Sequence, residues 1–125
     1  MYNRVKAGAP ARRRTEPSEA VSADKRTRRE RAIVRGMLRY LGDFGWYARR
    51  VYDGSDTIPP CGVTGERNTI ETVFSTCYAS VHFMRANVHQ SGHVLLIAGN
   101  GEEIISDYGG PPDFRALVDD YLDSL

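Results

Sequence analysis

Residues 93–108 read HVLLIAGNGEEIISDY, and this stretch decides the fold. Its first half, His93–Gly99, contains five consecutive apolar residues and is typical of a central strand. Asn100 and Gly101 follow, a pair typical of a two-residue hairpin turn in which both central residues have positive φ. The apolar pair Ile104-Ile105 comes next. The stretch therefore predicts two antiparallel strands joined at Asn100-Gly101.

Two more strands are predicted upstream of this hairpin. Residues 78–85 alternate between two sets of side chains, as in a strand with one buried face. A turn through Asn87–Gly92 connects this strand to His93–Gly99, which completes a three-strand meander. Trp46–Tyr52 alternates in the same way and predicts a further strand.

Three helices are predicted around these strands. They span residues 22–41, residues 68–77 and the segment from residue 112 onward. Ser22 or Asp24 can cap the first helix. Two of the helices carry a clear apolar stripe, formed by Ile33, Val34, Met37, Leu38 and Leu41 in the first and by Phe114, Leu117, Val118, Tyr121, Leu122 and Leu125 in the last.

The order helix, strand, helix, three-strand meander, helix predicts an α+β fold. We expect a three- or four-stranded antiparallel sheet with the helices packed on one face. Residues 22–125 are expected to form a single domain. Residues 1–21 contain few large apolar groups, too few to offset the entropy cost of ordering, so they predict a disordered basic tail.

The formal net charge of +1 conceals a strong asymmetry along the chain. Residues 1–31 hold ten lysines and arginines against four acids, a net of +6. Residues 101–125 hold one arginine against seven acids, a net of −6. Such opposite poles indicate either two surfaces for different partners or attraction between copies, so a homodimer is one possible arrangement.

The remaining composition places the chain among globular proteins without a membrane span. The longest apolar run has five residues, whereas a bilayer-crossing helix needs about 20. Residues 1–10 are polar and basic, unlike a secretory signal. Two cysteines, Cys61 and Cys77, cannot form a disulfide scaffold, so we expect a cytoplasmic location.

The residues that could carry chemistry do not form a known motif. His82, His89, His93, Cys61 and Cys77 are candidate zinc ligands, but no Cys-x2-Cys pair is present and Gly92 places the last two histidines in a turn. Cys61 could act as a nucleophile with one of these histidines as its base, yet it lacks a recognisable local signature. We therefore expect no catalytic residues, no metal and no cofactor.

An arginine ridge on the first helix suggests nucleic-acid binding as an alternative function. Its members are Arg28, Arg31, Arg35 and Arg39. Together with the basic tail, they could follow a phosphate backbone and release its counterions. Because the ridge contains no side chain suited to reading base edges, we expect such binding to be weakly sequence-specific.

Protein binding is the leading prediction. Aromatic and arginine side chains, the types that dominate interface hot spots, cluster on and beside the first strand. The candidate partner-binding residues there are Trp46, Tyr47, Arg49, Arg50 and Tyr52. Strict strand alternation places Trp46 and Tyr47 on opposite faces, so at least one of them should reach the surface. Asp119, Asp120 and Asp123 on the last helix could contact a basic partner.

The segment from His93 to Tyr108 resembles a stretch of small uncharacterised proteins of phages and mobile elements. In those proteins an apolar strand, a Gly-Asn-Gly turn and an Ile-Ser-Asp end precede a loop and an acidic helix. The likeness covers residues 68–125. It implies a non-enzymatic accessory factor, of the kind that binds and inhibits a host enzyme or defence complex.

Overall fold

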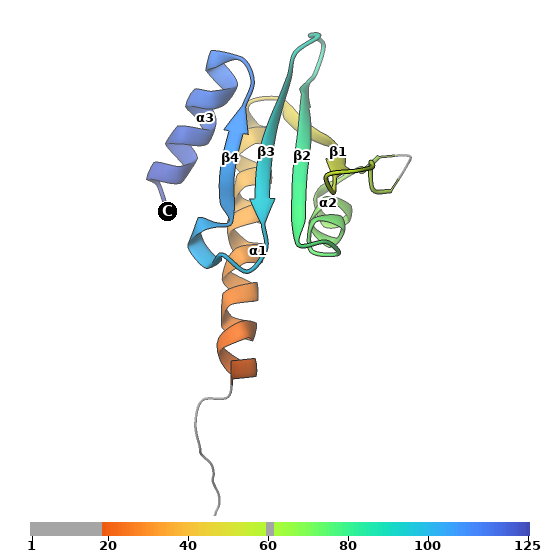
Figure 1. Ribbon diagram of the computed structural model, residues 1–125. Helices are drawn as coiled ribbons and strands as arrows, with labels where there is room; N and C mark the ends of the chain where they lie inside the picture. The colour runs from red at the N-terminus through yellow and green to blue at the C-terminus, as the bar shows by residue number, and fades with distance from the viewer. Residues whose placement is uncertain (1–18, 60–61) are drawn as a thin grey trace, which may run out of the picture.

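The computed structural model describes residues 19–59 and 62–125 (Figure 1). The elements are α1 (Glu19–Asp43), β1 (Trp46–Tyr52), α2 (Glu66–Val73), β2 (Tyr78–Arg85), β3 (Ser91–Ile97), the 3₁₀ helix η1 (Gly101–Glu103), β4 (Ile105–Gly109) and α3 (Pro112–Asp123). The strands form one antiparallel sheet in the order β1-β2-β3-β4. The predicted α+β class is confirmed.

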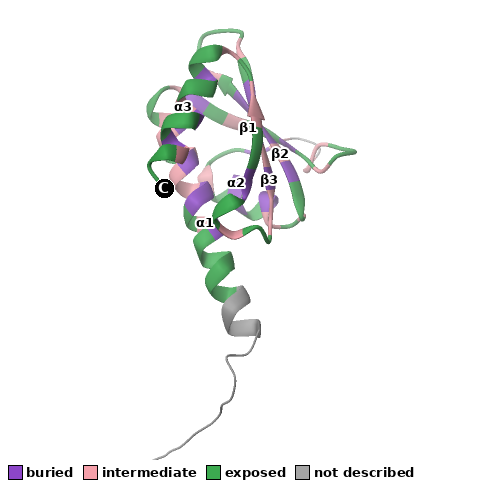
Figure 2. Cartoon of the chain, turned by 60° about the vertical axis from the view of Figure 1, so that its left-hand side comes forward, coloured by how far each residue is buried: buried purple, intermediate pink, exposed green. Residues whose placement is uncertain are grey.

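The helices lie on one side of the sheet, as predicted (Figures 1 and 2). The apolar stripe of α1 supplies fully buried side chains to the core, among them Ile33, Val34, Met37 and Leu41. Alternate residues of the central strands meet them, namely Ala79, Val81 and Phe83 on β2 with Val94 and Leu96 on β3. The core therefore lies between α1 and one face of the sheet.

A β-bulge at Arg49 changes the predicted alternation of β1. Ala48 pairs with Phe83 and Arg50 pairs with His82, so one extra residue sits on β1. As a result Trp46 and Val51 are both buried, although strict alternation puts them on opposite faces. The bulge thereby moves Tyr52 to the outer face of the sheet.

The outer edge of β1 is hydrogen-bonded by the segment that follows it. Ile58 N–H donates to the carbonyl of Val51 over 2.8 Å, and Val63 N–H donates to the carbonyl of Arg49 over 2.9 Å. Tyr52 also forms an isolated bridge with Thr57. These bonds satisfy backbone groups that an edge strand otherwise presents to solvent.

The predicted hairpin turn at Asn100-Gly101 is wrong. Asn100 has a φ of −86°, and Gly101–Glu103 form the short helix η1 between β3 and β4. This connection is held from α1: the buried carboxylate of Glu30 accepts the N–H of Gly99 over 2.9 Å and that of Gly101 over 2.6 Å. Hydrogen bonds to Glu30, a residue far away in the sequence, therefore stabilise this connection in place of a two-residue turn.

The helix boundaries also differ from those predicted. α1 begins at Glu19 and ends at Asp43, so it includes residues 19–21 of the predicted tail, while residues 1–18 lie outside the described part of the chain. α2 begins at Glu66 after Gly65 and ends at Val73. The predicted helix over residues 68–77 included Cys77, but Cys77 lies after α2 and is exposed.

Helix α3 packs on β3 through a contact that requires glycine. The ring of Phe114 lies over Gly92, where an added Cβ would stand 2.5 Å from Cδ2 of that ring. The same ring contacts Trp46 edge-on, with ring centroids 4.8 Å apart.

We predict that Gly92→Ala lowers the free energy of unfolding by about 2 kcal/mol, because the new methyl group overpacks the Phe114 ring. Chemical denaturation with urea measures the change. Ser91→Ala on the same strand is the control, since Ser91 is exposed and should shift stability by less than about 0.5 kcal/mol. Equal stability of the two variants contradicts the prediction.

Replacing Glu30 by alanine is expected to lower the free energy of unfolding by about 2 kcal/mol, because two N–H groups lose a charged acceptor. Glu103→Ala, an exposed change in η1, serves as the control. Hydrogen exchange should accelerate at the amides of Gly99 and Gly101 in the first variant. Unchanged exchange at both amides contradicts the role assigned to Glu30.

Candidate functional site

The outer face of the sheet is formed by the strand residues that point away from the helices. We call it the open face; by register its residues include Tyr47, Arg50, Tyr52, Tyr78, Ser80, His82, Met84, Ser91, His93, Leu95, Ile97 and Asp107. The register places Arg50, His82 and His93 in one row across the sheet. Tyr52, Ser80, Leu95 and Asp107 form the next row.

Large apolar side chains are exposed on this face. Tyr52 is 39% exposed, and Tyr78 and Met84 are each 42% exposed. Among the described residues, the helices all lie on the opposite side of the sheet (Figure 2). The open face therefore leaves large apolar side chains in contact with solvent, beside polar and charged residues.

Three rings cross the open face side by side. The rings of Tyr52 and His82 have centroids 5.3 Å apart, and those of His82 and His93 are 6.1 Å apart. The His93 ring continues over Gly109 on β4, where an added Cβ would stand 2.7 Å from Cε1 of His93. Glycine at this position lets the imidazole lie flat against the sheet.

The electrostatics of this row favour a neutral imidazole. Partial burial lowers the pKa of His82 below its ordinary value of 6.5, and the nearby charges of His93 and Arg50 lower it further. The side chain is also 3.4 Å from the hydroxyl of Ser80, measured from Nε2 to Oγ. The lowered pKa favours the neutral form of the His82 ring at neutral pH.

Trp46 is not a surface residue, which corrects its prediction as a partner-binding side chain. It is 1% exposed and packs between Phe114 and the guanidinium of Arg85, which lies 5.6 Å from the ring centroid. Tyr47 is the neighbour that reaches the surface, with 50% exposure. Arg49 and Arg50 are both exposed, and their role in partner binding stays a prediction.

A pocket of about 310 Å³ lies where the end of α1 meets β1 and the start of α2. Tyr47, Leu38 and Ala48 contribute apolar walls. The ion pair between Arg39 and Glu66 forms another part of the lining. The pocket is thus at the edge of β1, separate from the row of rings.

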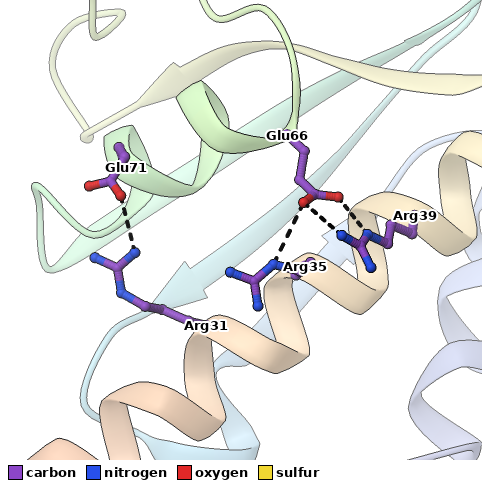
Figure 3. A network of polar contacts seen from close by, with 5 residues as sticks. All are labelled: Arg31, Arg35, Arg39, Glu66 and Glu71. Atoms are coloured by element: carbon purple, nitrogen blue, oxygen red, sulfur yellow. Dashed lines mark hydrogen bonds and ion pairs between the residues drawn. The ribbon is translucent and has the colours of Figure 1, made fainter.

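The arginine ridge of α1 faces α2 (Figure 3). Arg39 holds Glu66 through two hydrogen bonds of 2.7 and 3.1 Å, and Arg35 lies 3.6 Å from the same carboxylate. Arg31 donates to Glu71 over 3.4 Å. Of the four ridge arginines, Arg28 is exposed nearer the start of the helix. Three of them therefore already have carboxylate partners within the chain.

Helix α3, which carries the predicted acidic residues, lies on the helix side of the sheet (Figures 1 and 2). Asp119, Asp120 and Asp123 are all exposed. Asp119 accepts a hydrogen bond from the hydroxyl of Tyr108 and raises the pKa of that tyrosine. One of the three predicted acids is thus partly engaged in holding α3 to β4.

The candidate zinc ligands are only partly brought together. His82 and His93 are direct cross-strand neighbours, whereas His89 is exposed in the turn between β2 and β3. Cys61 lies outside the described residues. Within residues 19–59 and 62–125, no three histidine, cysteine or acidic side chains are grouped to hold a metal ion.

Most residues of the open face were not predicted as a site from the sequence. Tyr78, Met84 and Leu95 were assigned to strands but not to a site, although their outward positions follow from the alternation of β2 and β3. The alternation of a strand does not show which of its two faces the helices cover. On β2 the outward residues Tyr78, Ser80 and His82 are more polar than the inward Ala79, Val81 and Phe83, and this difference could have identified the exposed side.

We predict that His82 titrates below pH 6.5 and that Arg50→Gln raises its pKa, because one repelling charge is lost. Since the unfolded chain binds this proton more readily, His82 makes folding less favourable as the pH falls through about 6.5. A two-dimensional NMR titration of the imidazoles measures the pKa. Arg67→Gln, at an exposed position on α2, is the control. A lower pKa in Arg50→Gln contradicts the assignment.

No described helix is long and apolar enough to cross a membrane. Comparisons with protein-family models, with curated proteins and with solved structures find no match to this chain. The resemblance of residues 68–125 to phage and mobile-element proteins therefore stays a prediction. What the site does has to be argued from its own side chains.

Proposed function

We propose that this chain is a non-enzymatic protein-binding domain and that the open face is its docking surface. The observation that carries the proposal is the exposure of Tyr52, Tyr78 and Met84 on a sheet whose other face is covered by helices. Tyrosine, methionine and arginine are enriched at protein interfaces, where they supply large contact areas at low entropy cost. Docking as an inhibitor of a host enzyme or defence complex is the finer form of this proposal.

The geometry of the open face suits binding better than catalysis. Ser80 and His82 are close, but they lie on a central strand whose backbone N–H groups are paired with neighbouring strands. A developing oxyanion needs free donors aimed at it, and a paired strand does not supply them. A rigid sheet, in contrast, presents its side chains in a fixed array to a partner surface.

A protein partner fits this face better than a phosphate backbone. Arg50 is balanced by Asp107 at the other edge, so the face has no excess of cations. The ridge of α1 contains more positive charge, but Arg31, Arg35 and Arg39 are paired with carboxylates of α2. Nucleic-acid binding through Arg28 and the basic tail remains the alternative.

A photocrosslinking residue at Met84, introduced into the full chain in the cells that naturally contain it, tests the proposal. We expect a discrete, protease-sensitive adduct, which Tyr52→Ala in the same chain reduces at least fivefold. The same probe at Ala32, exposed on α1, is the matched control and should give no such adduct.

Three results would overturn the proposal. An adduct removed by nuclease indicates nucleic acid on this face. Discrete protein adducts from Asp120 on α3, with none from Met84, place the docking surface on the acidic helix. Equal labelling from Met84 and Ala32 shows that the open face has no preferred partner.

A further inference from the structure

The open face carries opposite charges at its two edges. Arg50 is exposed on β1 and Asp107 is exposed on β4, the two outer strands of the sheet. Three strand spacings separate them, about 14 Å, so they cannot form an ion pair within one copy. An ion pair between these two residues is therefore available only between two copies of the chain.

A two-fold axis between two open faces brings these charges together. If the axis runs parallel to the strands, β1 of one copy lies opposite β4 of the other. Arg50 then faces Asp107 twice, once on each side of the axis. The two residues are one row apart, about 7 Å along the strands, which a long arginine side chain and the roughly 30° rotation of packed sheets accommodate.

The middle of the open face can also pack against its copy about this two-fold axis. Between the charged edges lie the rings of Tyr52, His82 and His93 with the side chain of Leu95. This part of the face has no carboxylate, lysine or arginine, so two copies bring rings and an aliphatic side chain together at the centre. Met84 and Tyr78 extend the contact along the strands.

We propose that the partner of the open face is a second copy of this chain, packed sheet to sheet about a two-fold axis with reciprocal Arg50–Asp107 pairs. The inference rests on the proposed function, because it keeps protein docking on the open face and names a second copy, in place of a host enzyme or defence complex, as the protein that docks there. It differs from pairing between the basic start and the acidic end of the chain, which uses other residues.

The size of the face sets the expected strength. Four strands and about six residues along each give an area of roughly 20 by 20 Å, or about 400 Å² for each copy. A standard stable interface buries about 800 Å² for each partner. We therefore expect a dissociation constant in the micromolar range rather than an obligate dimer.

Sedimentation equilibrium of the full chain over a wide concentration range tests the inference. Arg50→Asp and Asp107→Arg should each weaken the dimer at least tenfold, because each change places two like-charge pairs in the interface. The double variant carries both changes and should recover affinity to within about threefold of the original chain. Asp120→Arg, on exposed α3, is the control and should leave the dissociation constant unchanged.

A chain that remains monomeric at millimolar concentration overturns the inference. So does a dimer that ignores both single changes, or one that only Asp120→Arg weakens, since that dimer uses the charged poles. The proposed function has a separate outcome: if the chain is monomeric but the Met84 probe still labels a different protein, only the second-copy inference fails. If the probe labels no protein either, both fail.

Discussion

Helix α1 is the element on which the rest of the structure depends. Its apolar stripe closes the inner face of the sheet, and each neighbour is attached to it by a different kind of bond. Glu30 accepts two backbone N–H groups from the β3–β4 connection, while Arg39 holds the start of α2. The hydroxyl of Tyr121 donates to the carbonyl of Ile33 over 2.6 Å and so fixes α3. Helix α1 therefore fixes the positions of the β3–β4 connection, of α2 and of α3.

This dependence explains why the two faces of the sheet differ so strongly. Because α1 runs along a single side, the fully buried apolar side chains of the strands lie there, whereas the side chains of the other face are partly buried or exposed. The arginines that α1 directs toward α2 serve the same packing, since Arg31 also lies over the ring of Phe74, 4.8 Å from its centroid. Charged residues that look available in the sequence are thus used to hold helices, and the strands carry the accessible aromatic surface.

The sequence predicted the elements well and their details less well. Trp46–Tyr52 and Tyr78–Arg85 are strands with the predicted bounds, because side-chain alternation is a local property. The bulge at Arg49 was not predictable, since it depends on the partner strand and on Val63 bonding to its carbonyl. The turn at Asn100 failed because Glu30, seventy positions away, supplies a better set of hydrogen bonds. The candidate site shows the same difference between local and distant effects. Exposed residues were predicted on β1, but the prediction that Trp46 binds a partner was wrong because Phe114 of α3 packs against its ring.

The edges of the sheet have a consequence for how the molecule behaves when crowded. The N–H groups of Ile58 and Val63 donate hydrogen bonds to carbonyls on the outer edge of β1. At the other edge, β4 is only five residues long, and the N–H of Tyr108 donates to the carboxylate of Asp107. Open-ended stacking into fibrils starts from long, unsatisfied edges. Because its sheet edges are blocked, this chain can expose aromatic side chains on the open face without adding further strands edge to edge. Association through the open face then ends at a closed oligomer and does not continue into a fibril.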